Sequence, residues 1–204
     1  MLVLLDRSEA RLQQTSLPSG DRVMAIGGLD LGSPEVVSRV AREAMERFGR
    51  LDGLVCTVGA FRMGDKAYDE SLDDWRGMFD ANLRTTIAAC QAVAPLLRDR
   101  TGRIVTVGAR ASLKGIGGMA AYSAAKAAVV RFTESLADDL AEREITANCV
   151  LPSIIDTPAN REAMPKADHS RWVQPSAIAD VIVFLLSDRA RAVSGAAIPV
   201  FGRS

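Results

Sequence analysis

Two side chains with complementary proton chemistry stand four residues apart, in the segment Tyr122-Ser-Ala-Ala-Lys126. On a helix this spacing places both side chains on one face, one turn apart. A neighbouring ammonium favours the phenolate and lowers the pKa of a tyrosine from its usual value near ~10. Such a tyrosine can pass a proton to a carbonyl oxygen or an imine nitrogen while hydride arrives. Tyr-x-x-x-Lys also occurs on solvated helix faces, so the surrounding sequence is needed to tell whether this pair is catalytic.

The elements that would position this pair are short apolar runs alternating with longer amphipathic stretches. Apolar runs predict strands at residues 2–5, 22–26, 51–57, 103–107, 145–151 and 196–200. Helical spacing of apolar residues predicts helices at 34–48, 72–97, 120–142 and 175–186. Strands that alternate with helices indicate a parallel sheet, and uniformly apolar strands indicate helices on both faces. We therefore predict an α/β fold with a doubly wound parallel sheet, as one domain of residues 1–204.

Composition excludes several classes of protein. The 25 basic and 25 acidic residues give no net charge, so no nucleic-acid partner is expected. No stretch of 18 apolar residues occurs, and the N-terminal segment has no basic region before its apolar run. The cysteines are three and far apart, at Cys56, Cys90 and Cys149. We therefore expect a cytoplasmic protein with no membrane partner, no disulfide framework and no metal site.

The segments around the Tyr–Lys pair resemble the short-chain dehydrogenase/reductase family. Asn82 lies in Phe79-Asp-Ala-Asn-Leu, where that family keeps a helix asparagine. Gly102-Arg-Ile-Val-Thr-Val stands at the expected distance before the tyrosine, and Gly195-Ala-Ala-Ile-Pro-Val matches the closing strand. The resemblance runs from about Leu2 to the C-terminus. It implies a Rossmann-like fold, an NAD or NADP cofactor, a small-molecule substrate and oxidoreductase activity.

The resemblance also implies roles for individual residues. Tyr122 would donate the proton, Lys126 would lower its pKa and hold the nicotinamide ribose, and Asn82 would support the proton relay. Asp6, at the end of the first strand, would accept from the adenine ribose hydroxyls and repel a 2′-phosphate, which favours NAD over NADP. The remaining expected cofactor contacts are Asp30, Gly59, Pro152 and Thr157.

A narrower resemblance points to dihydropteridine reductase and its bacterial relatives. It is carried by Asp156-Thr-Pro-Ala-Asn and the residues that follow, within a polar substrate loop at about 152–174. The family's catalytic serine should stand thirteen residues before the tyrosine, where this chain has Ala109, as dihydropteridine reductase does. Ser112 is a weak candidate to replace the missing hydroxyl. Trp172 could stack on a flat pterin ring, or it could pack the loop onto the domain.

The sequence has no counterpart of the strand, glycine-rich turn and helix with which the family opens. That turn supplies amide donors for the cofactor pyrophosphate. Gly27-Gly28 follows a strand, but no helix begins until Ser33. The missing strand would be central, so one edge of each of its two neighbouring strands should be left without a backbone partner. Three explanations stay open: an internal methionine of a longer protein, a natural variant in which another strand fills the gap, or a degenerate member that no longer catalyses.

The leading functional hypothesis is reduction of a conjugated carbonyl or imine compound with NAD(P)H, such as a dihydropteridine-like substrate. The alternatives are a generic carbonyl reductase and a non-catalytic scaffold that has lost cofactor binding. Apolar residues lie on more than one face of the predicted helices 72–97 and 120–142. One face must cover the sheet, and the remainder predicts a homodimer or homotetramer.

Overall fold

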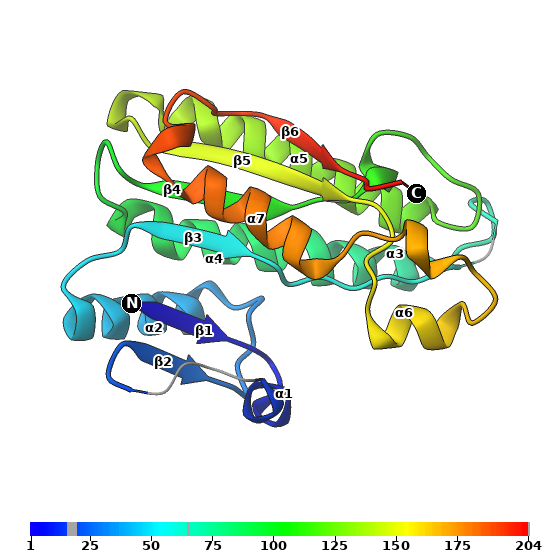
Figure 1. Ribbon diagram of the computed structural model, residues 1–204, viewed down its shortest axis with the longest axis horizontal. Coiled ribbons are helices and arrows are strands. Elements are labelled where there is room, and N and C mark those ends of the chain that lie inside the picture. Colours follow the sequence, from blue (N-terminus) through cyan, green and yellow to red (C-terminus); the bar gives the residue numbers. More distant parts are fainter. Residues whose placement is uncertain (16–19, 65, 204) are drawn as a thin grey trace.

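The computed structural model describes residues 1–15, 20–64 and 66–203 (Figure 1). Its strands are β1 (Leu2–Leu5), β2 (Val23–Ile26), β3 (Gly53–Cys56), β4 (Arg103–Val107), β5 (Thr146–Pro152) and β6 (Ala197–Val200). Its α-helices are α1 (Glu9–Gln14), α2 (Pro34–Phe48), α3 (Leu72–Phe79), α4 (Thr85–Val93), α5 (Ala120–Asp139), α6 (Pro158–Ala163) and α7 (Pro175–Leu186). Within this part of the chain, no helix is both long and apolar enough to cross a bilayer.

All strand pairs are parallel, which confirms the predicted α/β class. The strands form two sheets, a pair in the order β1-β2 and a larger sheet in the order β3-β4-β5-β6. In the larger sheet Cys56 is in register with Thr106, and Thr106 with Cys149. The carboxyl ends of three neighbouring strands therefore meet at one edge, where open α/β sheets bind their ligands.

Helices cover both faces of the larger sheet (Figure 1). Ile104 on β4 packs in one cluster with residues of α2, α4 and α5. The next residue, Val105, packs on the opposite face with Ile178 and Leu185 of α7. Successive side chains of a strand point to opposite faces, so a strand covered on both sides must be apolar throughout. This is why the strands read as continuous apolar runs in the sequence.

The predicted helix ends are confirmed where local chemistry sets them. Ser33 caps α2 by accepting from the Val36 N–H, and Pro34 occupies the first turn. Gly49 ends the helix with a φ of 75°, in the left-handed region that favours glycine. The predicted helix 72–97 is wrong as a single α-helix, because a π-helical turn at Asp80–Arg84 separates α3 from α4.

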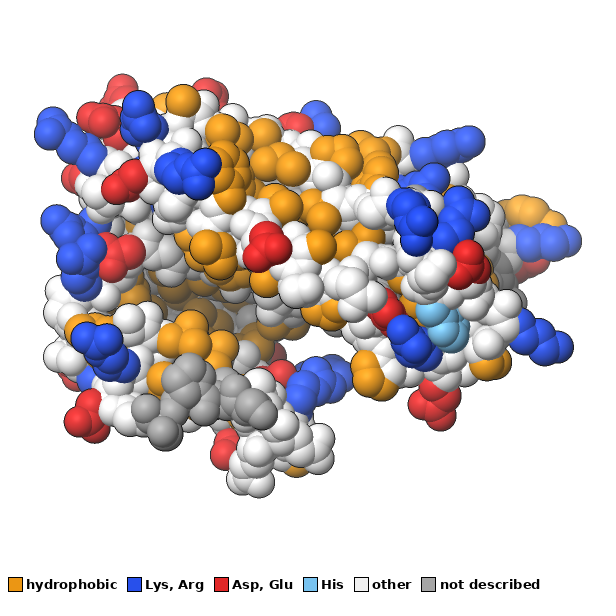
Figure 2. Space-filling model, in the orientation of Figure 1, with side chains coloured by type: hydrophobic (Ala, Val, Ile, Leu, Met, Phe, Trp, Pro, Cys, Tyr) orange, Lys and Arg blue, Asp and Glu red, His pale blue; other side chains and the backbone are white. Residues whose placement is uncertain are grey.

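A slot separates the two sheets. It has a volume of about 820 Å³, and its walls are the whole of β1 on one side and β3 on the other. Helices α2 and α4 line it as well, and so does Leu186 of α7. Figure 2 shows the corresponding hollow between the two parts of the molecule.

Backbone groups of both strands face this slot. The Leu2 N–H donates to the Arg22 carbonyl, just before β2, and the Asp6 N–H donates to the Ile26 carbonyl. The alternating residues Val3 and Leu5 therefore direct their backbone groups away from β2. By the same alternation, the Arg103 N–H bond to the Asp52 carbonyl leaves Gly53 and Val55 facing away from β4. Neither edge has a strand partner among the described residues. The expectation of two strand edges without backbone partners agrees with this arrangement.

Candidate active site

The predicted catalytic residues meet where the segment after β3 passes helices α4 and α5. Asn82 is fully buried in the π-helical turn, and its amide donates to the Ala60 carbonyl at 3.0 Å. The Ala60 N–H donates back to Asn82 Oδ1 at 3.2 Å. One side chain thus holds both backbone groups of Ala60, so Asn82 fixes the path of the chain just beyond β3.

Asn82 also explains the π-helical turn locally. Its amide donates to the Met78 carbonyl at 2.9 Å, and Thr86 donates its hydroxyl to the Asn82 carbonyl at 2.8 Å. Side chains therefore occupy carbonyls that an α-helix would offer to backbone N–H groups. Turns with this wider spacing are frequent at functional sites.

Gly59 lies against Asn82 and Lys126. A Cβ added at Gly59 would lie 2.7 Å from Asn82 Oδ1 and 3.1 Å from Lys126 Nζ. Lys126 is buried and donates to the Val107 carbonyl at 2.8 Å, so its ammonium is held at the carboxyl end of β4. Burial lowers the pKa of Lys126 from 10.5 to about 8. The sequence placed these residues in one site, and the structure brings all three into one cluster.

Tyr122 lies one helical turn before Lys126 on α5, as its spacing predicts. Its ring packs with Met78, Ala121 and Ala125. The expected lowering of its pKa is wrong for this structure, because burial raises the pKa of Tyr122. The ammonium of Lys126 is engaged by the Val107 carbonyl instead. At neutral pH the phenol therefore carries its proton, which is the state a proton donor needs.

Ala109 is buried at the carboxyl end of β4 and brings no hydroxyl to the site. Ser112 donates its hydroxyl to the Ala109 carbonyl at 2.5 Å, closing its own turn. The side chain of Ser112 is thus engaged within this turn, and the structure gives no sign that it replaces the family's serine.

The two carboxylates expected at the adenine end follow the β1-β2 pair. Asp6 accepts from the Ser8 N–H at 2.8 Å and lies 3.7 Å from the guanidinium of Arg11. Asp30 accepts from the Gly32 N–H at 2.9 Å and so shapes the turn that leads into α2. The Leu29 N–H donates to the Asp6 carbonyl at 3.4 Å, which joins the two loops.

The loop after β5 places the remaining expected residues. Pro152 ends β5, and Thr157 caps α6 by accepting from the Asn160 N–H at 3.2 Å. Trp172 is only 6% exposed and packs on the ring of His169, with centroids 4.3 Å apart. Of the two roles expected for Trp172, this burial favours packing of the loop onto the domain over stacking on a substrate.

Sequence reasoning missed the closest aromatic neighbour of Tyr122. The ring of Phe61 lies 5.0 Å from the Tyr122 ring, centroid to centroid, at an interplanar angle of 88°. Phe61 is a single aromatic in an irregular segment, so no periodicity marks it. Its place two residues after Gly59 is the one signal that could have found it.

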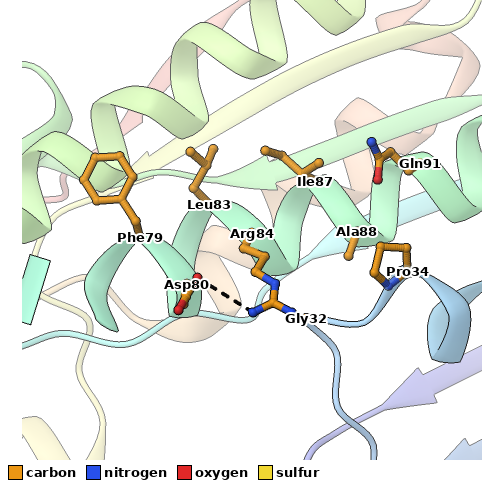
Figure 3. A pocket seen from close by; sticks show the side chains of 9 residues that line it. All are labelled: Gly32, Pro34, Phe79, Asp80, Leu83, Arg84, Ile87, Ala88 and Gln91. Carbon is orange, nitrogen blue, oxygen red and sulfur yellow. Dashed lines mark ion pairs between the residues drawn. The ribbon is translucent and has the colours of Figure 1, made fainter. Parts of the chain in front are cut away.

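Figure 3 shows a second, shallower pocket on the outer side of the π-helical turn and α4. Its volume is about 220 Å³, and Phe79, Leu83 and Ile87 line it together with the ion pair of Asp80 and Arg84. Among the described residues, no group of three or more His, Cys, Asp or Glu side chains could hold a metal ion.

Comparisons with known proteins agree with this arrangement. Residues 1–202 match the family model described as enoyl-(acyl carrier protein) reductase. The chain belongs to the short-chain dehydrogenase/reductase family. It is 32% identical over 182 residues to a 3-oxoacyl-[acyl-carrier-protein] reductase of Synechocystis, covering 86% of this chain and 73% of the relative. As a member of this family, the chain is an NAD(P)-dependent oxidoreductase.

Solved structures of family members have the same fold. A Brucella melitensis short-chain dehydrogenase/reductase, described as a glucose/ribitol dehydrogenase, is 33% identical and superimposes with a TM-score of 0.89. That match covers 98% of this chain and 84% of the other. A blue fluorescent protein from a metagenomic library, solved in complex with NADPH, is 31% identical with a TM-score of 0.78, covering 89% and 75% of the two chains.

Proposed function

We propose that the chain reduces a conjugated carbonyl or imine compound with NAD(P)H, and that Tyr122 donates the proton. The observation that carries the proposal is the cluster of Gly59, Asn82 and Lys126, with Tyr122 one helical turn before Lys126 on α5. A bound nicotinamide cofactor supplies the hydride. Tyr122 neutralises the negative charge that develops on the substrate oxygen or nitrogen as hydride arrives.

The cluster fits the nicotinamide–ribose end of such a cofactor. Gly59 is exposed and has no side chain, so a ligand can approach the buried Lys126 ammonium there. Lys126 donates hydrogen bonds to ribose hydroxyls, and Asn82 keeps the Ala60 backbone in place. Pro152 at the end of β5 and Thr157 at the start of α6 line the nicotinamide side.

The adenine end of the cofactor is assigned to Asp6 and Asp30. A carboxylate at the end of β1 accepts from ribose hydroxyls and repels a 2′-phosphate, which favours NAD over NADP. The complex of the metagenomic relative with NADPH supports NADP as the alternative. Fluorescence titration with NADH and NADPH decides between them. If the assignment is correct, Asp6→Asn should bring the Kd for NADPH closer to the Kd for NADH. An unchanged difference between the two Kd values would contradict the assignment.

We also propose that the slot between β1 and β3 is the place of the family's first βα unit, which has no counterpart within residues 1–204. The support is the pair of unpartnered strand edges that face one another across the slot. Without the glycine turn, the pyrophosphate loses charge-assisted hydrogen bonds of roughly 1.5–3 kcal/mol each. Two lost bonds weaken binding by about two decades or more. A low-micromolar Kd for NADH would overturn this part of the proposal.

The proposed substrate class follows from Ala109, which stands where the family has the hydroxyl of its catalytic serine. Ala109 leaves Tyr122 as the proposed hydrogen-bond donor to the substrate, which suits a conjugated, dihydropteridine-like compound that accepts hydride readily. A generic carbonyl reductase is the second candidate, favoured by the 32% identical relative whose name specifies a 3-oxoacyl substrate. Steady-state turnover of a quinonoid dihydropterin against a 3-oxoacyl thioester separates the two. Turnover of neither by a cofactor-loaded protein would favour the non-catalytic scaffold.

We propose that residues 1–204 act as one domain in a cytoplasmic homodimer or homotetramer. The described cysteines are free and buried, which suits a reducing compartment. The apolar groove at Leu83 and Ile87 offers a face for self-association (Figure 3). Sedimentation at micromolar concentration tests this proposal, and a monomer there would contradict it.

A further inference from the structure

We infer that Phe61 is a specificity-determining residue that selects substrates in which the reacting carbonyl carries a flat apolar ring. The inference rests on the proposed function, because it concerns the substrate that meets Tyr122. Phe61 keeps 57% of its surface exposed while its ring stands perpendicular to the Tyr122 ring at 5.0 Å. An aromatic side chain so placed forms a wall beside the proton donor.

The backbone holds this wall in position from both sides. On one side, Asn82 binds both backbone groups of Ala60. On the other, the Gly64 N–H donates to the Gly118 carbonyl at 2.8 Å, which ties the segment to the loop before α5. Between these anchors, Arg62 pairs with Asp74. The backbone that carries Phe61 is therefore held on both sides, although the ring itself is largely in water.

Phe61 is not an isolated exposed apolar residue. Large apolar side chains that remain 39–62% exposed also follow the carboxyl ends of β3, β4 and β5, at Met63, Leu113, Ile116 and Ile154. We call these four residues and Phe61 the apolar rim. The bond between Gly64 and Gly118 places the segments after β3 and β4 against each other. Grouped apolar side chains at a ligand-binding edge mark a surface that a ligand covers.

The chemistry of the rim limits the substrate. An aromatic wall favours a flat ring, which it meets offset-stacked or edge to face. Such a contact changes affinity by about two- to tenfold beyond the effect of buried area alone. A small aliphatic carbonyl compound reaches Tyr122 without covering Phe61, so it gains nothing from the ring. Phe61 should therefore lower the KM of substrates that carry a ring and leave the KM of small aliphatic carbonyl compounds unchanged.

The test uses two diketones that differ in one substituent, 1-phenyl-1,2-propanedione and 2,3-butanedione. We expect Phe61→Ala to raise KM for the phenyl compound about tenfold, with kcat within about threefold and butanedione kinetics unchanged. Phe61→Tyr, which keeps an aromatic ring, should have the wild-type KM for 1-phenyl-1,2-propanedione. The control is Phe184→Ala, because Phe184 is also a partly exposed phenylalanine, 40% exposed on α7. Equal effects of Phe61→Ala on both diketones, or no effect on either, would overturn the inference.

The Tyr122→Phe variant separates this inference from the proposed function. If it keeps full turnover, the proposed function fails; if it is inactive while Phe61→Ala matches wild type, only the inference fails. Should the wild-type protein turn over neither diketone, saturation-transfer NMR measures their binding directly. Phenyl-ring signals transferred by wild type and by Phe61→Tyr, and lost with Phe61→Ala, support the inference. Absence of phenyl binding by wild type would refute it.

Discussion

Gly59 leaves no room for a side chain beside Asn82 and Lys126, and replacing this glycine with alanine tests the cluster directly. The added methyl would stand 2.7 Å from Asn82 Oδ1, closer than a carbon and an oxygen can approach. Asn82 cannot yield freely, because its side chain is fully buried and bonded to Met78 and Ala60. Lys126 Nζ, 3.1 Å away, closes the other side. Gly59→Ala must therefore displace the amide or the backbone it holds.

The expected magnitude follows from the bonds at stake. Leaving a buried polar group without its partner costs about 1–3 kcal/mol. We expect Gly59→Ala to lower the free energy of unfolding by that amount, which for a chain of this size corresponds to a Tm lower by roughly 2–10 °C. The matched control is Gly77→Ala, since a Cβ at Gly77 in α3 meets nothing within 4 Å. Alanine there should raise stability by about 0.5–1 kcal/mol, because it is the better helix former.

The measurement is urea unfolding of both variants followed by far-ultraviolet circular dichroism. A Gly59→Ala protein as stable as wild type would show that Asn82 is not held as described. The proposed function would then lose its main support, which is the cluster of Gly59, Asn82 and Lys126. If Gly59→Ala and Gly77→Ala both raised the free energy of unfolding by the same amount, the reasoning would also be refuted. The crowding at Gly59 would then have no effect on stability.

Further consequences concern the proton donor, the buried lysine and the loop. Tyr122→Phe should reduce turnover about 10²–10⁴-fold and leave NADH fluorescence titrations unchanged, while Ser112→Ala should change little because its hydroxyl bonds to Ala109. Because burial lowers the pKa of Lys126 from 10.5 to about 8, the unfolded chain binds more protons between these values, so the free energy of unfolding rises with pH there. Urea titrations of Lys126→Met should lack that rise, which is on the order of 3 kcal/mol; a parallel pH dependence would contradict the burial. Trp172→Ala should cost about 3–5 kcal/mol in the same assay, and a neutral effect would contradict its packing role.

The regular elements could be predicted because their determinants are local. Ser33, Pro34 and Gly49 set the ends of α2 through caps that are visible in the sequence. Two short helices, α1 and α6, were not predicted because they lack such local signals. Helix α1 has no buried residue, and α6 is six residues long, so neither shows the apolar periodicity that reveals a helix.

The candidate site could be predicted only as a set of residues. The spacing of Tyr122 and Lys126 shows that both lie on one helix face, but not where the ammonium points. The Val107 carbonyl that receives it is nineteen residues away, on another element. Electrostatic expectations from sequence therefore fail at the pKa of Tyr122, which depends on burial rather than on the neighbouring charge. Phe61 was missed because its meaning depends on the tertiary contact with Tyr122.

One asparagine links the two halves of the proposed site. Asn82 limits the space at Gly59, where the nicotinamide ribose would approach Lys126, and it binds both backbone groups of Ala60, which precedes Phe61. The cofactor end and the substrate wall therefore share a single support. Asn82 stands in the π-helical turn between α3 and α4, and from there its amide reaches the segment after β3. In the proposed function, one buried side chain thus supports the place of the hydride source and the wall beside the proton donor.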